Sequence, residues 1–130
     1  MCPMPIIIVD DNLINLKLIN VMLTRNDFQA YTATNATEAL ALLKTISPVL
    51  ILMDIQLPGM DGLTLTRQLK ADSKTHDIPI IALTAFAMKG DEQRALGAGC
   101  DSYISKPIDV DTFIETITGV INAQKKKVKG

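Results

Sequence analysis

Residues 50–62 have the sequence LILMDIQLPGMDG, in which a short apolar run is followed by an aspartate and two turn signals. Four consecutive apolar residues, Leu50 to Met53, are enough for a strand buried on both faces and too few for a helix. Asp54 ends the run, and the turn signals Pro58-Gly59 and Asp61-Gly62 follow it closely. Asp54 therefore falls at the C-terminal end of a central strand, on the edge of an open parallel sheet where ligands bind.

Short apolar runs elsewhere predict four further strands, separated by helices. These strands are predicted at residues 6–9, 29–34, 79–84 and 102–105, and the segment 29–34 is expected to be shorter and nearer a sheet edge because it alternates apolar and polar residues. Apolar residues at helical spacing predict four helices: Leu16, Ile19 and Leu23; Ala39, Leu43 and Ile46; Leu65 and Leu69; and Phe113, Ile114, Ile117 and Ile121. Asp109 is expected to cap the last of them. With a fifth helix after residue 90, this alternation predicts an α/β fold with a doubly wound, five-stranded parallel sheet and helices on both faces.

Two of the predicted helices have residues typical of helix ends, one at its start and one at its finish. Asn35 followed by Glu38 resembles a capping box. The short helix from Asp91 to Leu96 is expected to be closed by Gly97 and Gly99, and its apolar face is thin. Because a helix that buries little surface is held weakly, this segment is a candidate for movement.

The composition predicts one domain with an acidic body. The 130 residues are 48% hydrophobic and 4% aromatic, which suits a core of aliphatic side chains. Four lysines lie in the last six residues, and without them 9 basic residues face 14 acidic ones. We expect a domain over residues 1–124, followed by a solvated Lys-rich tail at 125–130, and the acidic body argues against a nucleic-acid groove.

The cysteines, the single histidine and the lengths of the apolar runs indicate which metal sites and which cellular compartment to expect. Cys2 and Cys100 lack the spacing of a metal site, and the single histidine, His76, cannot form a histidine-based one. No apolar run approaches the ~20 residues of a membrane span, and the N-terminus carries no positively charged signal region. We expect a cytoplasmic protein with reduced thiols and no membrane association.

Polar side chains follow four of the predicted strands. Asp10 and Asp11 come after the first strand, Asp54 after the third, Thr84 after the fourth and Lys106 after the fifth. Two carboxylates about 4 Å apart repel by roughly 4 kcal/mol at an effective dielectric constant near 20, so three of them need a cation besides one lysine. Oxygen ligands without histidine or cysteine suit Mg²⁺.

A strand-end aspartate beside Mg²⁺ predicts phosphoryl chemistry. The Asp54 carboxylate can act as a nucleophile toward phosphorus and form an aspartyl-phosphate. Thr84 can donate a hydrogen bond to one phosphoryl oxygen, and Lys106 can offset the charge of another. Taken singly, Asp10-Asp11-Asn12 could be a helix cap and Thr84 a turn hydroxyl. Because groups that suit a phosphoryl group occur at four strand ends, a phosphoryl-transfer site is favoured over these separate structural roles.

These motifs together resemble the response-regulator receiver domain over essentially the whole chain. The resemblance rests on Val9-Asp10-Asp11-Asn12, Met53 to Gly62, Leu83-Thr84-Ala85 and Ser105-Lys106-Pro107-Ile108. It implies a flavodoxin-like (CheY-like) sheet with strand order 2-1-3-4-5. Residues 84–92, with Asp10-Asp11-Asn12 and Asn15, are similar more narrowly to stand-alone or phosphorelay receivers of the DivK type. Receivers of hybrid histidine kinases share this similarity.

The resemblance also implies a role for each acidic residue. Asp54 would be the phosphoacceptor. Asp10 and Asp11 would be the acidic metal pair, with Asp11 a direct Mg²⁺ ligand. The main-chain carbonyl of Gln56 would complete the ligands that the protein supplies, beside Asp54.

A switch and a set of partners are implied in the same way. Thr84 and Tyr103 would form the switch pair, and the Lys106–Pro107 peptide bond would be cis. The phosphodonor would be a histidine kinase or histidine phosphotransferase, and the target a protein bound through the fourth helix, the fifth strand and the last helix. We expect a monomer or weak dimer that binds no nucleic acid and is no enzyme beyond, at most, slow self-dephosphorylation.

Other functions share parts of this pattern. A phosphatase of the haloacid-dehalogenase type needs a second acid two residues after its nucleophile, where Gln56 cannot transfer a proton. A flavodoxin-like cofactor binder would place a phosphate loop where Asp10 and Asp11 would repel it. A receiver-like scaffold that is never phosphorylated is expected to have lost an acid, the threonine or the lysine, and none is lost. A receiver excised from a hybrid histidine kinase or a larger response regulator remains an open alternative.

Overall fold

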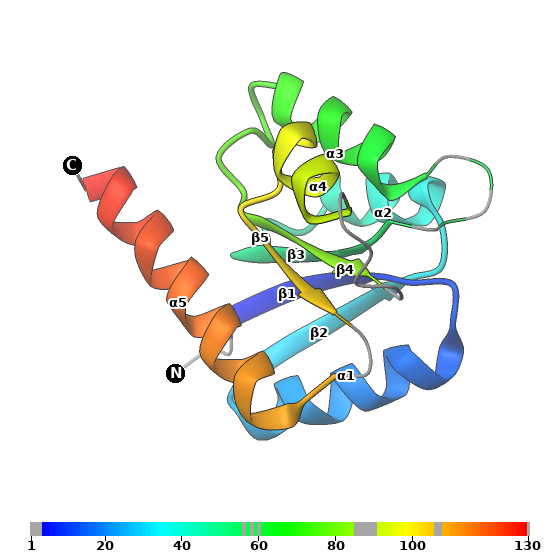
Figure 1. The fold of residues 1–130 in the computed structure, drawn as a ribbon, viewed down its shortest axis with the longest axis vertical. Helices are drawn as coiled ribbons and strands as arrows, with labels where there is room; N and C mark the ends of the chain where they lie inside the picture. The colour runs from blue at the N-terminus through cyan, green and yellow to red at the C-terminus, as the bar shows by residue number, and fades with distance from the viewer. Residues whose placement is uncertain are drawn as a thin grey trace.

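The five predicted strands form one parallel sheet in the computed structural model of the chain, with the expected order β2-β1-β3-β4-β5 (Figure 1). The strands are β1 (Met4–Val9), β2 (Phe28–Ala33), β3 (Leu50–Asp54), β4 (Ile80–Thr84) and β5 (Ser102–Ser105). β2 is an edge strand, as predicted, but it is as long as β1, with six residues each. The structure describes residues 4–55, 57, 59, 61–84, 91–105 and 108–129.

Helices cover both faces of the sheet. They are α1 (Leu13–Arg25), α2 (Ala36–Leu43), α3 (Gly62–Ala71), α4 (Asp91–Ala98) and α5 (Val110–Lys129). α1 and α5 lie on one face, and α2, α3 and α4 lie on the other (Figure 1). The doubly wound arrangement is therefore confirmed.

Alternate residues along each strand pack into two separate hydrophobic cores. In β1, Ile6 and Ile8 join the buried residues of α1 and α5, whereas Ile7 and Val9 join those of α2, α3 and α4. Successive side chains of a strand point to opposite faces of its sheet. A strand covered on both faces must therefore be apolar throughout, which explains the continuous apolar run of β1.

α2 begins at the predicted cap, but Glu38 bonds to a different residue than in a capping box and the helix ends earlier than predicted. Its N-cap is Asn35, as predicted, and the Asn35 side chain accepts a hydrogen bond from the Glu38 N–H at 2.9 Å. The Glu38 carboxylate, however, accepts from the hydroxyl and from the N–H of Thr34, at 2.7 and 2.6 Å, and these two bonds lower the pKa of Glu38. At the other end, the Thr45 N–H donates to the carbonyl three residues back, so the last turn tightens and the helix ends before Ile46.

α4 runs to Ala98, past its predicted end at Leu96, and is closed by Gly99, one of the two glycines predicted to close it. Gly99 has a φ of +111°, and its N–H donates to the carbonyl of Leu96 at 3.1 Å. The N–H of Cys100 donates to the carbonyl of Ala95 at 3.0 Å, so the two bonds form a Schellman motif. Gly97 stays helical, because a helical glycine costs only about 1 kcal/mol relative to alanine.

α5 extends over most of the Lys-rich residues that were expected to form a tail. Asp109 caps it, as predicted, and its side chain accepts a hydrogen bond from the Asp111 N–H at 3.0 Å. The helix runs to Lys129, so the predicted division at residue 124 falls inside it. Its far end projects away from the sheet (Figure 1). Among the residues that the structure describes, no helix is long and apolar enough to span a membrane.

Candidate functional site

Three carboxylates meet at the C-terminal edge of the sheet. β1 and β3 are neighbours in which Val9 pairs with Met53, so Asp10 and Asp54 lie side by side at the strand ends. Asp10, Asp11 and Asp54 each place one carboxylate oxygen within 4.8 Å of the others. Asp10 and Asp54 are only 0% and 4% exposed, whereas Asp11 is exposed to solvent. A cluster of oxygen donors with a solvent-facing member fits Mg²⁺, which binds through few carboxylates and keeps several waters.

Hydrogen bonds tie Asp10 to the start of α1. Asn12 is the N-cap of α1, and its side chain accepts bonds from the backbone N–H groups of Ile14 and Asn15, at 2.9 and 3.3 Å. The Asn12 N–H donates to Oδ1 of Asp10 at 2.9 Å, and Nδ2 of Asn15 donates to Oδ2 at 3.4 Å. The motif Asp10-Asp11-Asn12 therefore fits both interpretations, because Asn12 caps the helix and the two aspartates contribute carboxylates to the cluster.

Gly62 is a site residue that the sequence marks only as part of a turn. A Cβ at this position would collide with the main-chain carbonyl oxygen of Asp54 and would lie 2.8 Å from the Cα of Ile55. The Gly62 N–H donates to the Ile55 carbonyl at 3.2 Å, and Asp61 caps α3 by accepting from the Thr64 N–H at 2.8 Å. That bond lowers the pKa of Asp61. The start of α3 thus packs directly on the backbone that carries Asp54.

Thr84 and Tyr103 lie on the neighbouring strands β4 and β5. Thr84 ends β4 and is buried, and Asp54 pairs with the residue immediately before it. Tyr103 is half-buried, pairs with Ala82 and packs on the core that contains Ala82. Because Ala82 and Thr84 are two residues apart on one strand, Thr84 and Tyr103 share a face of the sheet.

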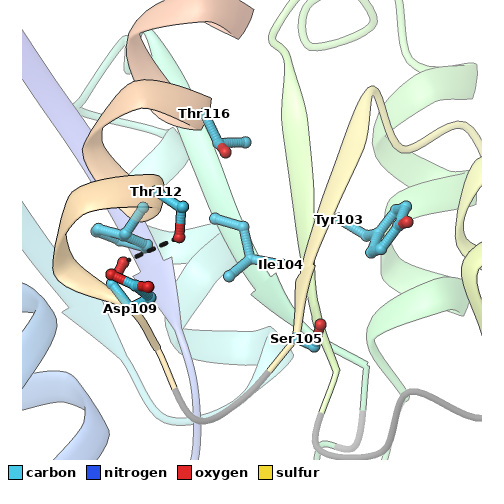
Figure 2. Close-up of a pocket in the computed structure, with 7 residues that line it drawn as sticks. Tyr103, Ile104, Ser105, Asp109, Thr112 and Thr116 are labelled. Carbon is cyan, nitrogen blue, oxygen red and sulfur yellow. Dashed lines mark hydrogen bonds between the residues drawn. The ribbon is translucent and has the colours of Figure 1, made fainter.

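A pocket of about 300 Å³ opens between β5 and the first turns of α5 (Figure 2). Its lining consists of Tyr103, Ile104, Ser105, Asp109, Thr112, Phe113 and Thr116. Ile104 points toward α5, whereas the ring of Tyr103 lies on the other side of the strand (Figure 2). Thr112 closes one side, and its hydroxyl donates to the Asp109 carbonyl at 3.3 Å. The pocket contains none of the three clustered carboxylates and lies on the face predicted to bind a target.

Three predicted site residues fall outside the part of the chain that the structure describes. They are Gln56, Lys106 and Pro107. The main-chain metal ligand, the strand-end cation and the cis peptide bond therefore stay predictions.

Comparison with known proteins decides the family. A family model described as the response regulator receiver domain matches residues 6–118. This chain belongs to the response-regulator receiver family. Receivers are two-component signalling domains and not typical enzymes, and phosphorylation of an aspartate and Mg²⁺ are general features of the family. No observation favours the phosphatase or the cofactor binder.

Relatives with curated names support the narrower similarity. The receiver is 50% identical over 115 residues to the polar-differentiation response regulator DivK of Brucella anthropi. The matched residues make up 88% of this chain and 94% of that protein. It is 49% identical over 112 residues to DivK of Brucella ovis, covering 86% of this chain and 91% of the relative. The predicted similarity to DivK-type receivers is therefore confirmed.

Solved structures share the fold. One similar structure is the receiver domain of a sensor histidine kinase from Pseudomonas aeruginosa, solved with a magnesium ion coordinated in its active-site cleft. It matches this chain with a TM-score of 0.85 and 31% sequence identity, and the match covers 92% of this chain and 98% of that one. A CheY-like receiver protein from Methanospirillum hungatei has a TM-score of 0.87 and 29% identity, covering 96% and 98%. The CheY-like topology predicted for this receiver is confirmed.

Proposed function

We propose that Asp54 of this receiver accepts a phosphoryl group from a phosphohistidine on a histidine kinase or histidine phosphotransferase. The observation that supports it is the meeting of Asp54 with Asp10 and Asp11 within 4.8 Å at the strand ends. One carboxylate oxygen of Asp54 forms the bond to phosphorus while the phosphorus–nitrogen bond breaks and the imidazole leaves. Gly62 contributes by allowing α3 to pack against the backbone of Asp54.

Mg²⁺ would be held by the carboxylates of Asp10, Asp11 and Asp54 and by the main-chain carbonyl of Gln56. When bound, Mg²⁺ offsets the charge of the carboxylates and of the phosphoryl oxygens. Asp11 is exposed, which suits a direct ligand of an ion that keeps part of its water shell. The Asp10 carboxylate is buried and accepts hydrogen bonds on both oxygens, which keeps it in one place beside Asp54.

Thr84 and Lys106 complete the proposed site. The Thr84 hydroxyl donates a hydrogen bond to one phosphoryl oxygen, and the Lys106 ammonium offsets the charge of another, with a cis bond to Pro107. The buried position of Thr84 on the strand next to Asp54 supports this role. When Thr84 moves toward the phosphoryl group, it vacates space on the sheet face that it shares with Tyr103, and the tyrosine ring follows.

The phosphodonor docks on the exposed side of α1. Ile14, Leu18 and Val21 are 77%, 44% and 49% exposed, and their spacing places them in one stripe opposite the buried Leu16 and Ile19. α1 follows the acidic pair directly, so this stripe begins beside the carboxylate cluster. An exposed apolar stripe at helical spacing suits the surface of a partner helix.

The phosphorylated receiver binds its target protein through α4, β5 and α5. The pocket between β5 and α5 supports this face as a binding surface, because a partner side chain can enter it (Figure 2). The acidic body favours a protein over nucleic acid. The receiver acts in the cytoplasm as a monomer or weak dimer and loses its phosphoryl group slowly by itself.

A small-molecule phosphodonor such as acetyl phosphate tests the acceptor. We expect one phosphoryl adduct per chain, located on Asp54 by mass spectrometry and formed only with Mg²⁺, because the three carboxylates repel the donor without it. Asp54→Asn and chelator should each abolish the adduct, whereas Asp77→Asn, which changes an exposed loop carboxylate, should leave it intact. An adduct that survives Asp54→Asn or chelation would contradict the proposal.

A further inference from the structure

The side chain of Asn15 connects α1 to the carboxylate of Asp10. Asn15 lies in the first turn of the helix and is half-buried, and its Nδ2 donates to Oδ2 of Asp10 at 3.4 Å. The other oxygen of the same carboxylate, Oδ1, accepts from the Asn12 N–H at 2.9 Å. Each oxygen of Asp10 therefore has a donor from the same end of α1.

These two bonds restrict the rotation of the Asp10 carboxylate, which the backbone contacts of Asp10 do not fix. The main chain at Asp10 is fixed to β2, because its N–H donates to the Ala33 carbonyl at 3.0 Å. The carboxylate is attached through rotatable side-chain bonds, and hydrogen bonds to both of its oxygens restrict that rotation. The bond from Asn15 supplies the restraint on Oδ2. Asn15 in turn is held by the Asn12 cap, which accepts its backbone N–H at 3.3 Å.

We propose that Asn15 is a positioning residue that fixes the rotation of the Asp10 carboxylate and thereby favours Mg²⁺ over larger divalent cations. The inference rests on the metal site proposed above. An amide carries no net charge, so its contribution lies in geometry more than in attraction. Mg²⁺ demands nearly ideal octahedral geometry with oxygens at about 2.0–2.1 Å, whereas Ca²⁺ accepts 6–8 oxygens at about 2.3–2.6 Å in flexible arrangements. A carboxylate with fixed rotation therefore benefits Mg²⁺ more.

The size of the effect follows from comparable positions in other proteins. Removing a hydrogen-bond partner of a metal-site residue typically costs about 10–100-fold in metal affinity. The bond from Asn15 is at the long end of hydrogen-bond distances, so we expect the lower end of that range, a loss of about tenfold for Mg²⁺. For Ca²⁺ the loss should be smaller, about threefold or less, because its coordination tolerates a rotated carboxylate.

Calorimetric titration of the full chain with MgCl₂ and with CaCl₂ tests the inference. Asn15→Leu keeps the size of the side chain and removes the donor, whereas Asn15→Gln keeps a donor and should retain a Mg²⁺ to Ca²⁺ affinity ratio close to the original. The matched control is Asn20→Leu, which removes an exposed amide of α1 that accepts from the Thr24 hydroxyl at 3.2 Å, far along the helix from Asp10. This control should change neither affinity.

The outcomes separate the inference from the function on which it rests. A larger loss for Mg²⁺ than for Ca²⁺ in Asn15→Leu, restored in Asn15→Gln, supports positioning. Unchanged Mg²⁺ affinity in Asn15→Leu, or equal losses for both ions, overturns the positioning role and leaves the metal site standing. If the unaltered chain binds no Mg²⁺, the metal site itself is wrong, and this inference falls with it.

Discussion

At the scale of single residues, Asp10, Asp11 and Asp54 place three negative charges within 4.8 Å, and two of these residues are buried. The repulsion destabilises the folded chain when no cation is bound. We therefore expect Asp54→Asn to raise the free energy of unfolding by about 1 kcal/mol in chelator. Asp11→Asn should gain less, because Asp11 is exposed and water screens its charge.

Urea unfolding with chelator and with excess Mg²⁺ measures this gain. It should vanish as Mg²⁺ is added, because the ion stabilises the unaltered chain by binding the folded cluster. The exposed loop variant Asp77→Asn serves as the control and should behave like the unaltered chain in both conditions. Equal or lower stability of Asp54→Asn in chelator would show that the cluster is not strained.

Gly62 gives a second test at the same scale. Gly62→Ala places a methyl group against the Asp54 carbonyl and 2.8 Å from the Cα of Ile55, so either the start of α3 or the Asp54 turn must shift. We expect a loss of about 1–3 kcal/mol in the free energy of unfolding, as for other overpacked sites. In contrast, Gly119→Ala lies in helix α5 with open space around the new methyl and should gain up to about 1 kcal/mol. Similar effects of both substitutions would contradict the proposed close contact.

These residues also show how far a sequence can predict a site. Asp10 and Asp54 could be found because apolar strands end at them, and the C-terminal ends of parallel strands meet at one edge. Gly62 is equally necessary, but its reason is the distance between the start of α3 and the backbone of Ile55. No local pattern encodes that distance, so the sequence marks Gly62 only as part of a turn.

At the scale of elements, the exposed side of α1 is the proposed contact for the phosphodonor. Leu18→Glu places a charge in the middle of the apolar stripe formed with Ile14 and Val21, which are 77% and 49% exposed. We expect phosphotransfer from a cognate histidine kinase to slow by tenfold or more, equivalent to about 1.4 kcal/mol. Labelling by acetyl phosphate should be unchanged, because it needs no docking surface.

The matched substitution is Asn20→Glu, at an exposed position of α1 outside the apolar stripe. It introduces the same residue with the same change in charge and should affect phosphotransfer less than Leu18→Glu. If the two substitutions slow transfer equally, charge and not the apolar stripe controls docking. If Leu18→Glu slows acetyl phosphate labelling as well, the substitution has disturbed the site itself.

Helix ends show the limit of sequence patterns at this scale. α4 contains two glycines two residues apart, and both are reasonable stops. Only Gly99 has a positive φ, and that conformation is fixed by the two hydrogen bonds that close the Schellman motif. In α2, Ile46 keeps the helical spacing of apolar residues, although the hydrogen bonds have already tightened at Thr45. Periodicity predicts that a helix exists more reliably than it predicts where the helix ends.

At the scale of the whole molecule, the proposed signal passes from Asp54 to α4 and β5. The described buried side chains of α4 are those of Ala95 and Ala98, which cover little apolar area and hold the helix weakly. When beryllofluoride and Mg²⁺ occupy the site, we expect altered amide hydrogen exchange at residues 91–99 and around Tyr103. β2, which lies at the opposite edge of the sheet, should keep its protection.

The exchange experiment needs Asp54→Asn with beryllofluoride as its control, and this variant should show none of the changes. If the turn after Asp54 changes protection while α4 and β5 do not, the proposed output face is wrong. If β2 and α4 change together, the transition is global and the weak packing of α4 is not its cause.

The sheet that separates the two hydrophobic cores also makes the receiver modular for engineering. The α1 stripe of Ile14, Leu18 and Val21 lies on one side of that sheet. α4, the helix of the proposed target surface that does not share a face with α1, lies on the other side, against a separate core, and its exposed residues include Gln93 and Leu96. Substitutions at distant sites that share no partners usually add in free energy. A new phosphodonor could therefore be selected by mutating the α1 stripe and a new target by mutating α4, and variants chosen in two separate libraries could then be combined in one chain.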